Sequence, residues 1–347
     1  MKLLVVTQKI DRNDPVLGFF HNWVIKLSEK FEKVSVVCLQ KGEYDLPKNV
    51  QVFSLGKESS RSKIKYVKNF LNLILGLHRE YDAVFVHMNQ EYVLLGGFIW
   101  KLMGKKVYMW RNHPDGTILT DISAWLSNGL FCTSEFSYIK KYKKTKLMPV
   151  GIDMKQFSII NSQFSNNKNK EILFLGRIGM IKKPDLLVEA VGILNKKGVD
   201  FECNFYGDPL PKDEEFYASI KNKAKELDLE NKVNFYKAVP NYETPKIYNE
   251  HGIFINLTPS GSFDKTILEA AACGCIVVVV NQSLSGKIDE RMIAESDEPA
   301  NVAKTIEFWL GVNDEERLEA SQKLQKYVLE NHSLSALIEE LCIRIKK

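Results

Sequence analysis

The sequence predicts an α/β protein built from two doubly wound domains, each with a parallel sheet that helices cover on both faces. Short runs rich in Val, Ile, Leu and Phe alternate with amphipathic segments along the chain, and such nearly continuous apolar runs are typical of buried parallel strands. The length of 347 residues exceeds one ordinary core and suits two domains of similar size.

The first domain is predicted to span 1–160. Its strands are expected at 2–7, 34–39, 83–87, 106–110 and 130–133, with helices at 21–32, 64–77 and 92–103 between them. A polar segment, 161–170, is interpreted as the linker, and the second domain is predicted to span 171–331. Its strands are expected at 172–176, 202–206, 233–236, 253–257 and 276–280, with helices near 184–197, 213–228, 242–250 and 265–273. Residues 332–347 predict a C-terminal helix that packs back toward the first domain.

Composition excludes several classes of protein. Hydrophobic residues make up 45% and charged residues 26%, which is unlike disordered, collagen-like or disulfide-scaffold chains. The six cysteines have no spacing that suits zinc, and we interpret them as buried thiols in a reducing compartment. The sequence shows no signal peptide and no apolar run of the ~18 residues that a membrane helix requires. A soluble cytoplasmic protein is therefore expected.

The strongest local pattern is a strand that ends at Gly176 and is followed by two cations, Arg177 and Lys182. A helix then begins near Pro184, a residue favoured in the first turn. Two cations at the carboxyl end of a parallel strand suit a diphosphate, which Arg meets bidentately and Lys as a point charge. The alternative is an ordinary solvated Lys/Arg loop.

A second pattern lies at 256–280, where a strand, a Gly/Ser turn and a helix starting near Asp264 follow one another. Backbone N–H groups around Phe263, Asp264, Lys265 and Thr266 are expected to be available to a phosphate at that helix start. Glu269 lies further along the helix, where it could reach a ribose diol. The alternative places Glu269 in a surface ion pair, although its apolar neighbours disfavour an exposed face.

Together these two segments resemble the donor-binding half of the family 4 retaining glycosyltransferases, which have the two-domain GT-B fold. That resemblance assigns Arg177 and Lys182, in the pattern GR(x)4K, to the donor diphosphate and Glu269 to the ribose. It is extended by LMPVGIDMKQF (147–157), by FCTSEFSYIKKY (131–142) and by VNFYKAVPNYETPKIY (233–248), in which Val239 would border the nucleotide base. The sequence has neither GxGxxG after a strand nor GxxxxGK[ST], which disfavours dehydrogenases and P-loop NTPases.

One position departs from the family pattern. The first Glu of the family's E(x)7E segment is replaced here by Gly261. In the family that Glu contacts hydroxyls of the donor hexose, so we hypothesise that Asp264 or Lys265 supplies the contact instead.

In the first domain, the resemblance implies a wall of the cleft opposite the donor domain. Gly18 opens a helix after the first strand and could bring backbone N–H groups toward the diphosphate. His113 matches the active-site His of the family, and His87, Asn89 and Arg111 are weaker candidates for the acceptor side. For His87, a structural role is the alternative.

The reaction that the resemblance implies is sugar transfer with retention of configuration, from a nucleotide-diphosphate donor to a glycan or lipid-linked acceptor in surface polysaccharide or glycoconjugate synthesis. UDP is the most frequent nucleotide in the family, with GDP behind it. No DxD motif is present, so no metal and no other cofactor is expected, the two cations taking the metal's place. Epimerases and phosphorylases share the fold but use other site residues. A non-catalytic partner that binds sugar nucleotide or glycan is the alternative from another class.

The net charge of +5 is too mild to indicate nucleic acid, but the two halves differ. Residues 1–170 contain 26 Lys and Arg against 14 Asp and Glu, whereas residues 171–347 contain 22 against 29. Much of the positive charge lies in two clusters, 57–77 and 137–146, that are mixed with apolar residues. Such clusters are typical of peripheral contact with an anionic membrane. Ordinary solvated helix faces are the alternative.

Overall fold

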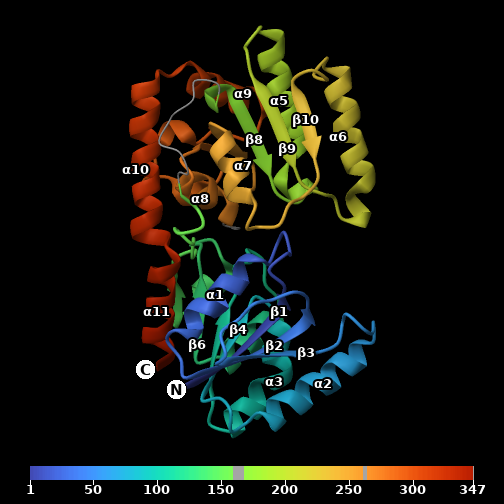
Figure 1. Cartoon of the computed structure of the whole chain (residues 1–347), viewed down its shortest axis with the longest axis vertical. Helices are drawn as coiled ribbons and strands as arrows, with labels where there is room; N and C mark the ends of the chain where they lie inside the picture. The colour runs from blue at the N-terminus through green and yellow to red at the C-terminus, as the bar shows by residue number, and fades with distance from the viewer. Residues whose placement is uncertain (159–167, 261–263, 347) are drawn as a thin grey trace. The chain divides into compact units, whose positions relative to one another are not determined.

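The computed structural model describes residues 1–158, 168–260 and 264–346, and the chain divides into two compact units (Figure 1). Unit 1 comprises Met1–Gly151 and Leu334–Lys347, and unit 2 comprises Ile152–Ser333. Each unit has one parallel sheet with helices packed on it, so the predicted class of two Rossmann-like α/β domains is confirmed.

The sheet of unit 1 has the order β3-β2-β1-β4-β5-β6-β7, and each pair of neighbours within the described residues is parallel. The register places Leu3 of β1 beside both Val34 of β2 and Ala83 of β4. The strands are β1 (Lys2–Ile10), β2 (Lys33–Lys41), β3 (Val50–Ser54), β4 (Ala83–His87), β5 (Lys106–Trp110), β6 (Gly129–Cys132) and β7 (Thr145–Leu147).

The apolar run of β1 explains the two helix layers of unit 1. Successive side chains of a strand point to opposite faces, so Leu3 and Leu4 enter different cores, and both are fully buried. The core on the Leu4 face includes residues of α2 (Lys63–Gly76), α3 (Gln90–Leu102) and α4 (Ile118–Leu126). The core on the Leu3 face includes residues of α1 (Phe19–Ser28) and α11 (Leu334–Lys346). The C-terminal helix is therefore part of unit 1.

Unit 2 repeats the plan with the strand order β10-β9-β8-β11-β12. Its strands are β8 (Glu171–Leu175), β9 (Glu202–Tyr206), β10 (Val233–Tyr236), β11 (Ile253–Asn256) and β12 (Ile276–Val279). Its α-helices are α5 (Pro184–Lys196), α6 (Glu214–Glu226), α7 (Thr244–Glu250), α8 (Lys265–Ala272), α9 (Pro299–Gly311) and α10 (Asp314–His332). Short 3-10 helices are η1 (Tyr138–Lys141) in unit 1, and η2 (Lys168–Lys170), η3 (Met180–Lys182), η4 (Pro211–Asp213), η5 (Gln282–Leu284) and η6 (Glu290–Met292) in unit 2.

Both sheets reverse their strand order beside their first strand. In unit 1 the chain runs outward from β1 through β2 to β3 and then returns to pair β4 with the other edge of β1. In unit 2 it runs from β8 through β9 to β10 and returns to pair β11 with β8. Ligands of open α/β sheets bind at the carboxyl ends of the strands at such a switch point. The topology therefore points to the loops after β1 and β4 and after β8 and β11.

The division of the chain differs from the predicted boundary at 161–170. The segment that precedes it already packs on unit 2, because the ring of Phe157 lies 6.2 Å from that of Tyr248. Gln156 Nε2 also donates to the backbone oxygen of Asn241 at 3.1 Å. Most of the segment interpreted as the linker, 159–167, lies outside the described residues. None of the helices that the structure describes is both long and apolar enough to cross a membrane.

Replacing Leu337 of α11 by Ala is expected to destabilise unit 1 by about 2–5 kcal/mol, because the side chain is fully buried in the Leu3-face core beside Trp23. Denaturant unfolding followed by tryptophan fluorescence would measure the loss. Ile343→Ala on the same helix is the matched control, since that side chain is 48% exposed and its truncation should change the free energy of unfolding by under about 1 kcal/mol. Equal losses in the two variants would contradict this account of α11.

Candidate functional site

The loop after β8 brings Lys182 back over the end of its own strand. Gly176 follows the strand with φ +151, a backbone conformation that residues with a side chain rarely adopt. A Cβ at this position would lie 3.1 Å from Nζ of Lys182. The backbone conformation therefore favours glycine here, and the lysine that approaches it is the cation predicted for this site.

Lys182 forms an ion pair with Asp264, which precedes α8. Both side chains are largely buried, with 22% and 13% of their surfaces exposed. The pair joins the loop after β8 to the start of the helix after β11, two strands that are neighbours in the sheet. The two predicted phosphate-binding segments thus meet at the switch point of unit 2.

Asp264 accepts hydrogen bonds on both carboxylate oxygens. Its Oδ1 accepts from the backbone N–H of Thr266 at 3.3 Å, as a helix N-cap does, and from the Thr266 hydroxyl at 2.9 Å. Its Oδ2 accepts from Asn256 Nδ2 at 2.9 Å as well as from Lys182. Burial alone would raise the pKa of Asp264, but the charge of Lys182 and these hydrogen bonds lower it to about 2. Both oxygens of the Asp264 carboxylate are therefore occupied by hydrogen bonds, and the carboxylate holds Lys182 in place.

Arg177, the other predicted cation, is exposed, and no described residue forms an ion pair with it.

Glu269 lies on α8 and is 2% exposed, so the alternative of a surface ion pair is wrong. Asn241 Nδ2 donates to its Oε1 at 3.3 Å and Tyr248 Oη to its Oε2 at 3.4 Å. Burial raises the pKa of Glu269, although the charge of Lys265 one turn earlier opposes that shift. Burial likewise lowers the pKa of Lys265 to about 8, against the charges of Glu269 and Asp153. A buried acceptor with two long hydrogen bonds is suited to exchanging them for ligand hydroxyls.

One further residue predicted from the sequence lies at the same end of unit 2. Val239 is half-buried in the loop between β10 and α7, two residues before the Asn241 that contacts Glu269. Phe263 and Gly261 lie outside the described residues. Asn256 and Tyr248 were not predicted as site residues. Asn256 could have been predicted, because it is a polar residue at the end of the buried strand Ile253–Asn256. The contact of Tyr248 with Glu269 depends on how α7 packs against α8, which the sequence does not show.

In unit 1, Gly18 lies in the loop after β1 and His87 is the last residue of β4, the two strands that flank the switch point, but His87 is buried. Its ring stacks on Phe20 with 4.1 Å between centroids, and its Nδ1 lies 3.3 Å from Oγ1 of Thr7. This favours the structural alternative for His87. A Cβ on Gly18 would lie 2.5 Å from the backbone oxygen of Asp14, so the tight loop before α1 requires glycine. Asn89 is half-buried at the N-cap of α3.

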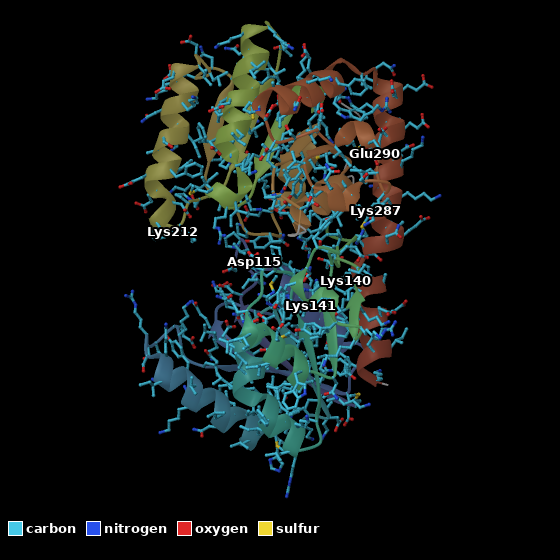
Figure 2. All side chains as sticks on the ribbon, turned by 180° about the vertical axis from the view of Figure 1, so that it is seen from behind. Asp115, Lys140, Lys141, Lys212, Lys287 and Glu290 are labelled. Atoms are coloured by element: carbon cyan, nitrogen blue, oxygen red, sulfur yellow. The ribbon has the colours of Figure 1, made fainter. Side chains whose placement is uncertain are left out.

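The loop after β5 holds His113 at the surface. The imidazole is 61% exposed, and its Nδ1 lies 3.0 Å from the backbone nitrogen and 3.1 Å from the backbone oxygen of Asp115 (Asp115 is labelled in Figure 2). Arg111 supports the loop from below, donating to the backbone oxygens of His113 at 3.2 Å and of Asp115 at 2.7 Å. Arg111 therefore positions this loop, whereas the imidazole of His113 is open to solvent.

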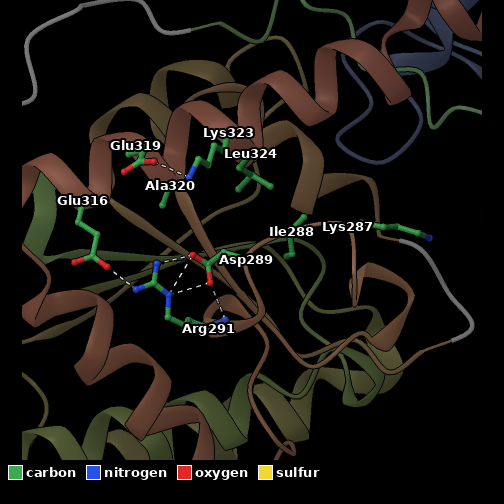
Figure 3. A pocket seen from close by; sticks show the side chains of 9 residues that line it. All are labelled: Lys287, Ile288, Asp289, Arg291, Glu316, Glu319, Ala320, Lys323 and Leu324. Carbon is green, nitrogen blue, oxygen red and sulfur yellow. Dashed lines mark hydrogen bonds and ion pairs between the residues drawn. The ribbon is translucent and has the colours of Figure 1, made fainter.

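A separate pocket of about 380 Å³ lies in unit 2 between η6 and α10 (Figure 3). It is lined by Lys287, Ile288, Asp289, Arg291, Glu316, Glu319, Ala320, Lys323 and Leu324. Arg291 is already paired with Asp289 at 2.6 Å and with Glu316 at 2.5 Å, and Lys323 with Glu319 at 2.6 Å. Because these charges neutralise one another and no predicted site residue lines it, this pocket is not the candidate site. Among the described residues, no group of His, Cys, Asp and Glu is arranged to hold a metal ion.

Comparison with known proteins gives one family and several relatives. Residues 155–327 match the family described as glycosyl transferases group 1. An uncharacterised glycosyltransferase of Haemophilus influenzae is 22% identical over 316 residues, which is 89% of this chain and 84% of that protein. Mannosylfructose-phosphate synthase of Agrobacterium fabrum is 28% identical over 153 residues, 41% of this chain. That match spans about a third of the synthase, 34% of its length.

The fold resembles that of Anabaena HepE in its crystal structure with UDP and glucose. The TM-score is 0.80 at 14% sequence identity, and the match covers 100% of both chains. The same Anabaena protein has also been crystallised with UDP-glucose. These likenesses agree with the expected GT-B fold of two Rossmann-like domains.

The Asp264 carboxylate is expected to stabilise unit 2 in a pH-dependent way. Its pKa of about 2 lies below the ordinary value of 3.8, so its contribution is complete above pH 4 and is lost as the pH falls toward 2. We expect the stability difference between wild type and Asp264→Asn to shrink by about 2 kcal/mol over that range. Denaturant unfolding at a series of pH values measures it.

The matched control is Asp200→Asn, whose partner Lys170 is 57% exposed and whose own side chain is 74% exposed. Solvent screens that pair, so its stability difference should change less with pH. A difference for Asp264→Asn that stays constant from pH 5 to pH 2 would contradict the assignment.

Proposed function

We propose that this chain, whose residues 155–327 match the family described as glycosyl transferases group 1, transfers a sugar from a nucleoside-diphosphate donor to a glycan or lipid-linked acceptor. The observation that carries the proposal is the meeting of Lys182, the N-terminus of α8 and the buried Glu269 at the switch point of unit 2. A cation, a helix N-terminus and a carboxylate are what a diphosphate and its ribose require.

In this proposal, Lys182 and Arg177 bind the diphosphate and stabilise the charge that develops on it as the glycosidic bond breaks. Lys182 has three N–H donors, and Asp264 takes one of them, which leaves two for phosphate oxygens. Arg177 contributes the exposed guanidinium. Since the two cations meet the charge of the leaving group, the proposed reaction is metal-independent.

Glu269 is proposed to accept from the ribose hydroxyls in place of its long bonds from Asn241 and Tyr248. Val239 is proposed to border the base, and the backbone at Gly18 and Thr266 to face the phosphates. UDP is the favoured nucleotide. The resemblance to family 4 supports it, and the Anabaena relative was crystallised with UDP and with UDP-glucose.

Asp264 is proposed as a positioning residue for Lys182. Its two oxygens already accept from Lys182, Asn256 and Thr266, so little capacity remains for a hexose hydroxyl. Lys265, the other candidate, is therefore proposed to contact the donor hexose in place of the first Glu of the family's E(x)7E segment. On the acceptor side, the exposed imidazole of His113 is proposed to hydrogen-bond to a sugar hydroxyl, and Arg111 to hold the loop that carries it.

Retention of configuration is proposed to follow from attack on the same face of the sugar that the diphosphate leaves. The leaving phosphate then accepts the proton of the acceptor hydroxyl, so that no second carboxylate is needed as a base. The setting proposed is synthesis of a surface polysaccharide or glycoconjugate. Peripheral contact with the inner face of an anionic membrane, through 57–77 and 137–146, brings the enzyme to a lipid-linked acceptor.

Lys182→Gln is expected to lower kcat/KM for the UDP-sugar roughly 10–150-fold, the loss of one charged hydrogen bond of about 1.5–3 kcal/mol to the leaving diphosphate. Steady-state kinetics with nucleoside-diphosphate release as the readout measures it. The matched control is Lys183→Gln, the next lysine in the chain, which pairs with Asp297 instead. It should retain kcat/KM within about threefold.

A Lys182→Gln enzyme with normal kcat/KM would contradict the proposal. If UDP raises the melting temperature but no donor and acceptor yield free nucleoside diphosphate, the chain is the non-catalytic binding partner considered as the alternative.

A further inference from the structure

The outer faces of α3 and α4 expose an unusual amount of apolar surface. The most exposed side chains are Leu102 at 88%, Ile118 at 74% and Trp125 at 59%. Isolated exposed apolar residues are common in globular proteins, but a contiguous group of large ones marks an interaction surface. The residues that form this apolar face are Leu95, Phe98 and Leu102 on α3 and Ile118, Ile122 and Trp125 on α4.

These six residues form one face because of helical spacing and of the packing of the two helices. Those of α3 recur at intervals of three and four, and those of α4 at four and three, so each set follows one side of its helix. The two helices pack against each other, and the rings of Phe98 and Trp125 lie 6.0 Å apart. Their opposite sides are buried in the core of unit 1 through Trp100 and Ala124. The core of unit 1 therefore does not require the apolar side chains of this outward face.

Positive charge borders the apolar face. Nζ of Lys101 lies 4.2 Å from the ring centroid of Trp125, and burial and the charge of Lys101 together lower the pKa of Lys144. Lys144 also donates to the backbone oxygen of Ser127, the residue that ends α4, at 2.6 Å. Lys143 and Lys146 beside it are exposed. Part of the basic cluster 137–146 thus lies at the edge of the apolar face.

The same segment is attached to α4 by specific contacts. Tyr138 Oη donates to Asp121 Oδ1 at 3.0 Å, and Lys141 pairs with the same oxygen at 2.9 Å (Lys140 and Lys141 are labelled in Figure 2). On the other side, α2 packs against α3 and carries the exposed Lys63, Lys65 and Lys68 of the first basic cluster. The apolar face therefore lies in one helix layer between the two clusters that the sequence analysis identified.

We infer that the outward face of α3 and α4 inserts shallowly into an anionic lipid bilayer, with the flanking lysines on its headgroups. This deepens the proposed membrane contact and rests on that part of the proposed function. Large aliphatic side chains, an exposed tryptophan and a lysine border are the combination that binds at a bilayer interface. A second copy of the chain fits less well, because a two-fold interface would oppose the lysine borders of the two copies.

Trp125 supplies a direct probe. The sequence has five tryptophans, and the other four, Trp23, Trp100, Trp110 and Trp309, are 0–2% exposed. A change of environment at the apolar face should therefore dominate any change in emission. With vesicles of phosphatidylglycerol and phosphatidylcholine, we expect a blue shift of the emission. Phosphatidylcholine vesicles alone should give a much smaller shift, because the lysines then gain little.

Co-sedimentation of the full chain with the same vesicles tests which surface binds. The double variant Leu102→Gln with Ile118→Gln should bind roughly tenfold more weakly, since two apolar side chains no longer enter the bilayer. The matched control is Ile343→Gln, which lies on α11 against the other face of the sheet and is 48% exposed. It should bind like wild type.

The inference is overturned if the double variant binds as well as wild type, or if Trp125 emission is unchanged when wild type sediments with vesicles. A stabilisation by UDP that is equal in wild type and the double variant shows that both are folded and that the donor site is independent of this result. Failure of vesicle binding with that stabilisation intact therefore rejects the membrane face and leaves the proposed sugar transfer in place.

Discussion

The ion pair between Lys182 and Asp264 is the interaction on which the rest of the candidate donor site depends. It joins segments that lie 82 residues apart and fixes the loop after β8 to the N-terminus of α8. The carboxylate is also the N-cap of the helix that carries Lys265 and Glu269, so one group orients the cation and starts the helix. The cost of removing two charges from water offsets the attraction within such a largely buried ion pair, but removing one partner leaves the other charge uncompensated. The ion pair matters because it fixes the positions of the Lys182 side chain and of the start of α8.

Parallel sheet topology explains why these particular loops meet. In both units the strand order reverses beside the first strand, which leaves the loops after β1 and β4, and after β8 and β11, without a helix between them. In unit 2 this gap contains the paired lysine and the helix start. In unit 1 it contains the loop closed by Gly18 and the N-terminus of α3. The sheet topology that requires buried apolar strands therefore also determines which loops can bring polar residues together.

The buried strands were predicted well from the sequence because each is a continuous apolar run, but β3 and β7 were missed. β3 is only partly buried, and β7 has three residues, so neither carries a continuous apolar run. The first domain was predicted to end at 160 because the polar run 161–170 was the local signal for a linker, whereas unit 1 ends at Gly151 and Phe157 packs on Tyr248 of unit 2. In the site, the cations and Glu269 followed from motif and helix position. Three other features depend on contacts that no local sequence pattern contains. These are the hydrogen bonds that occupy Asp264, the burial of His87 and the support that Arg111 gives to its loop.

The most direct test of the account is a double-mutant cycle on UDP binding. Dissociation constants from titration calorimetry are compared for wild type, Lys182→Gln, Asp264→Asn and the double variant at neutral pH. If Asp264 acts by holding Lys182, its substitution should weaken binding in wild type and have almost no further effect once Lys182 is gone, with a coupling of about 1 kcal/mol or more. Equal effects of Asp264→Asn in the two backgrounds, or tighter binding in wild type, would contradict the account.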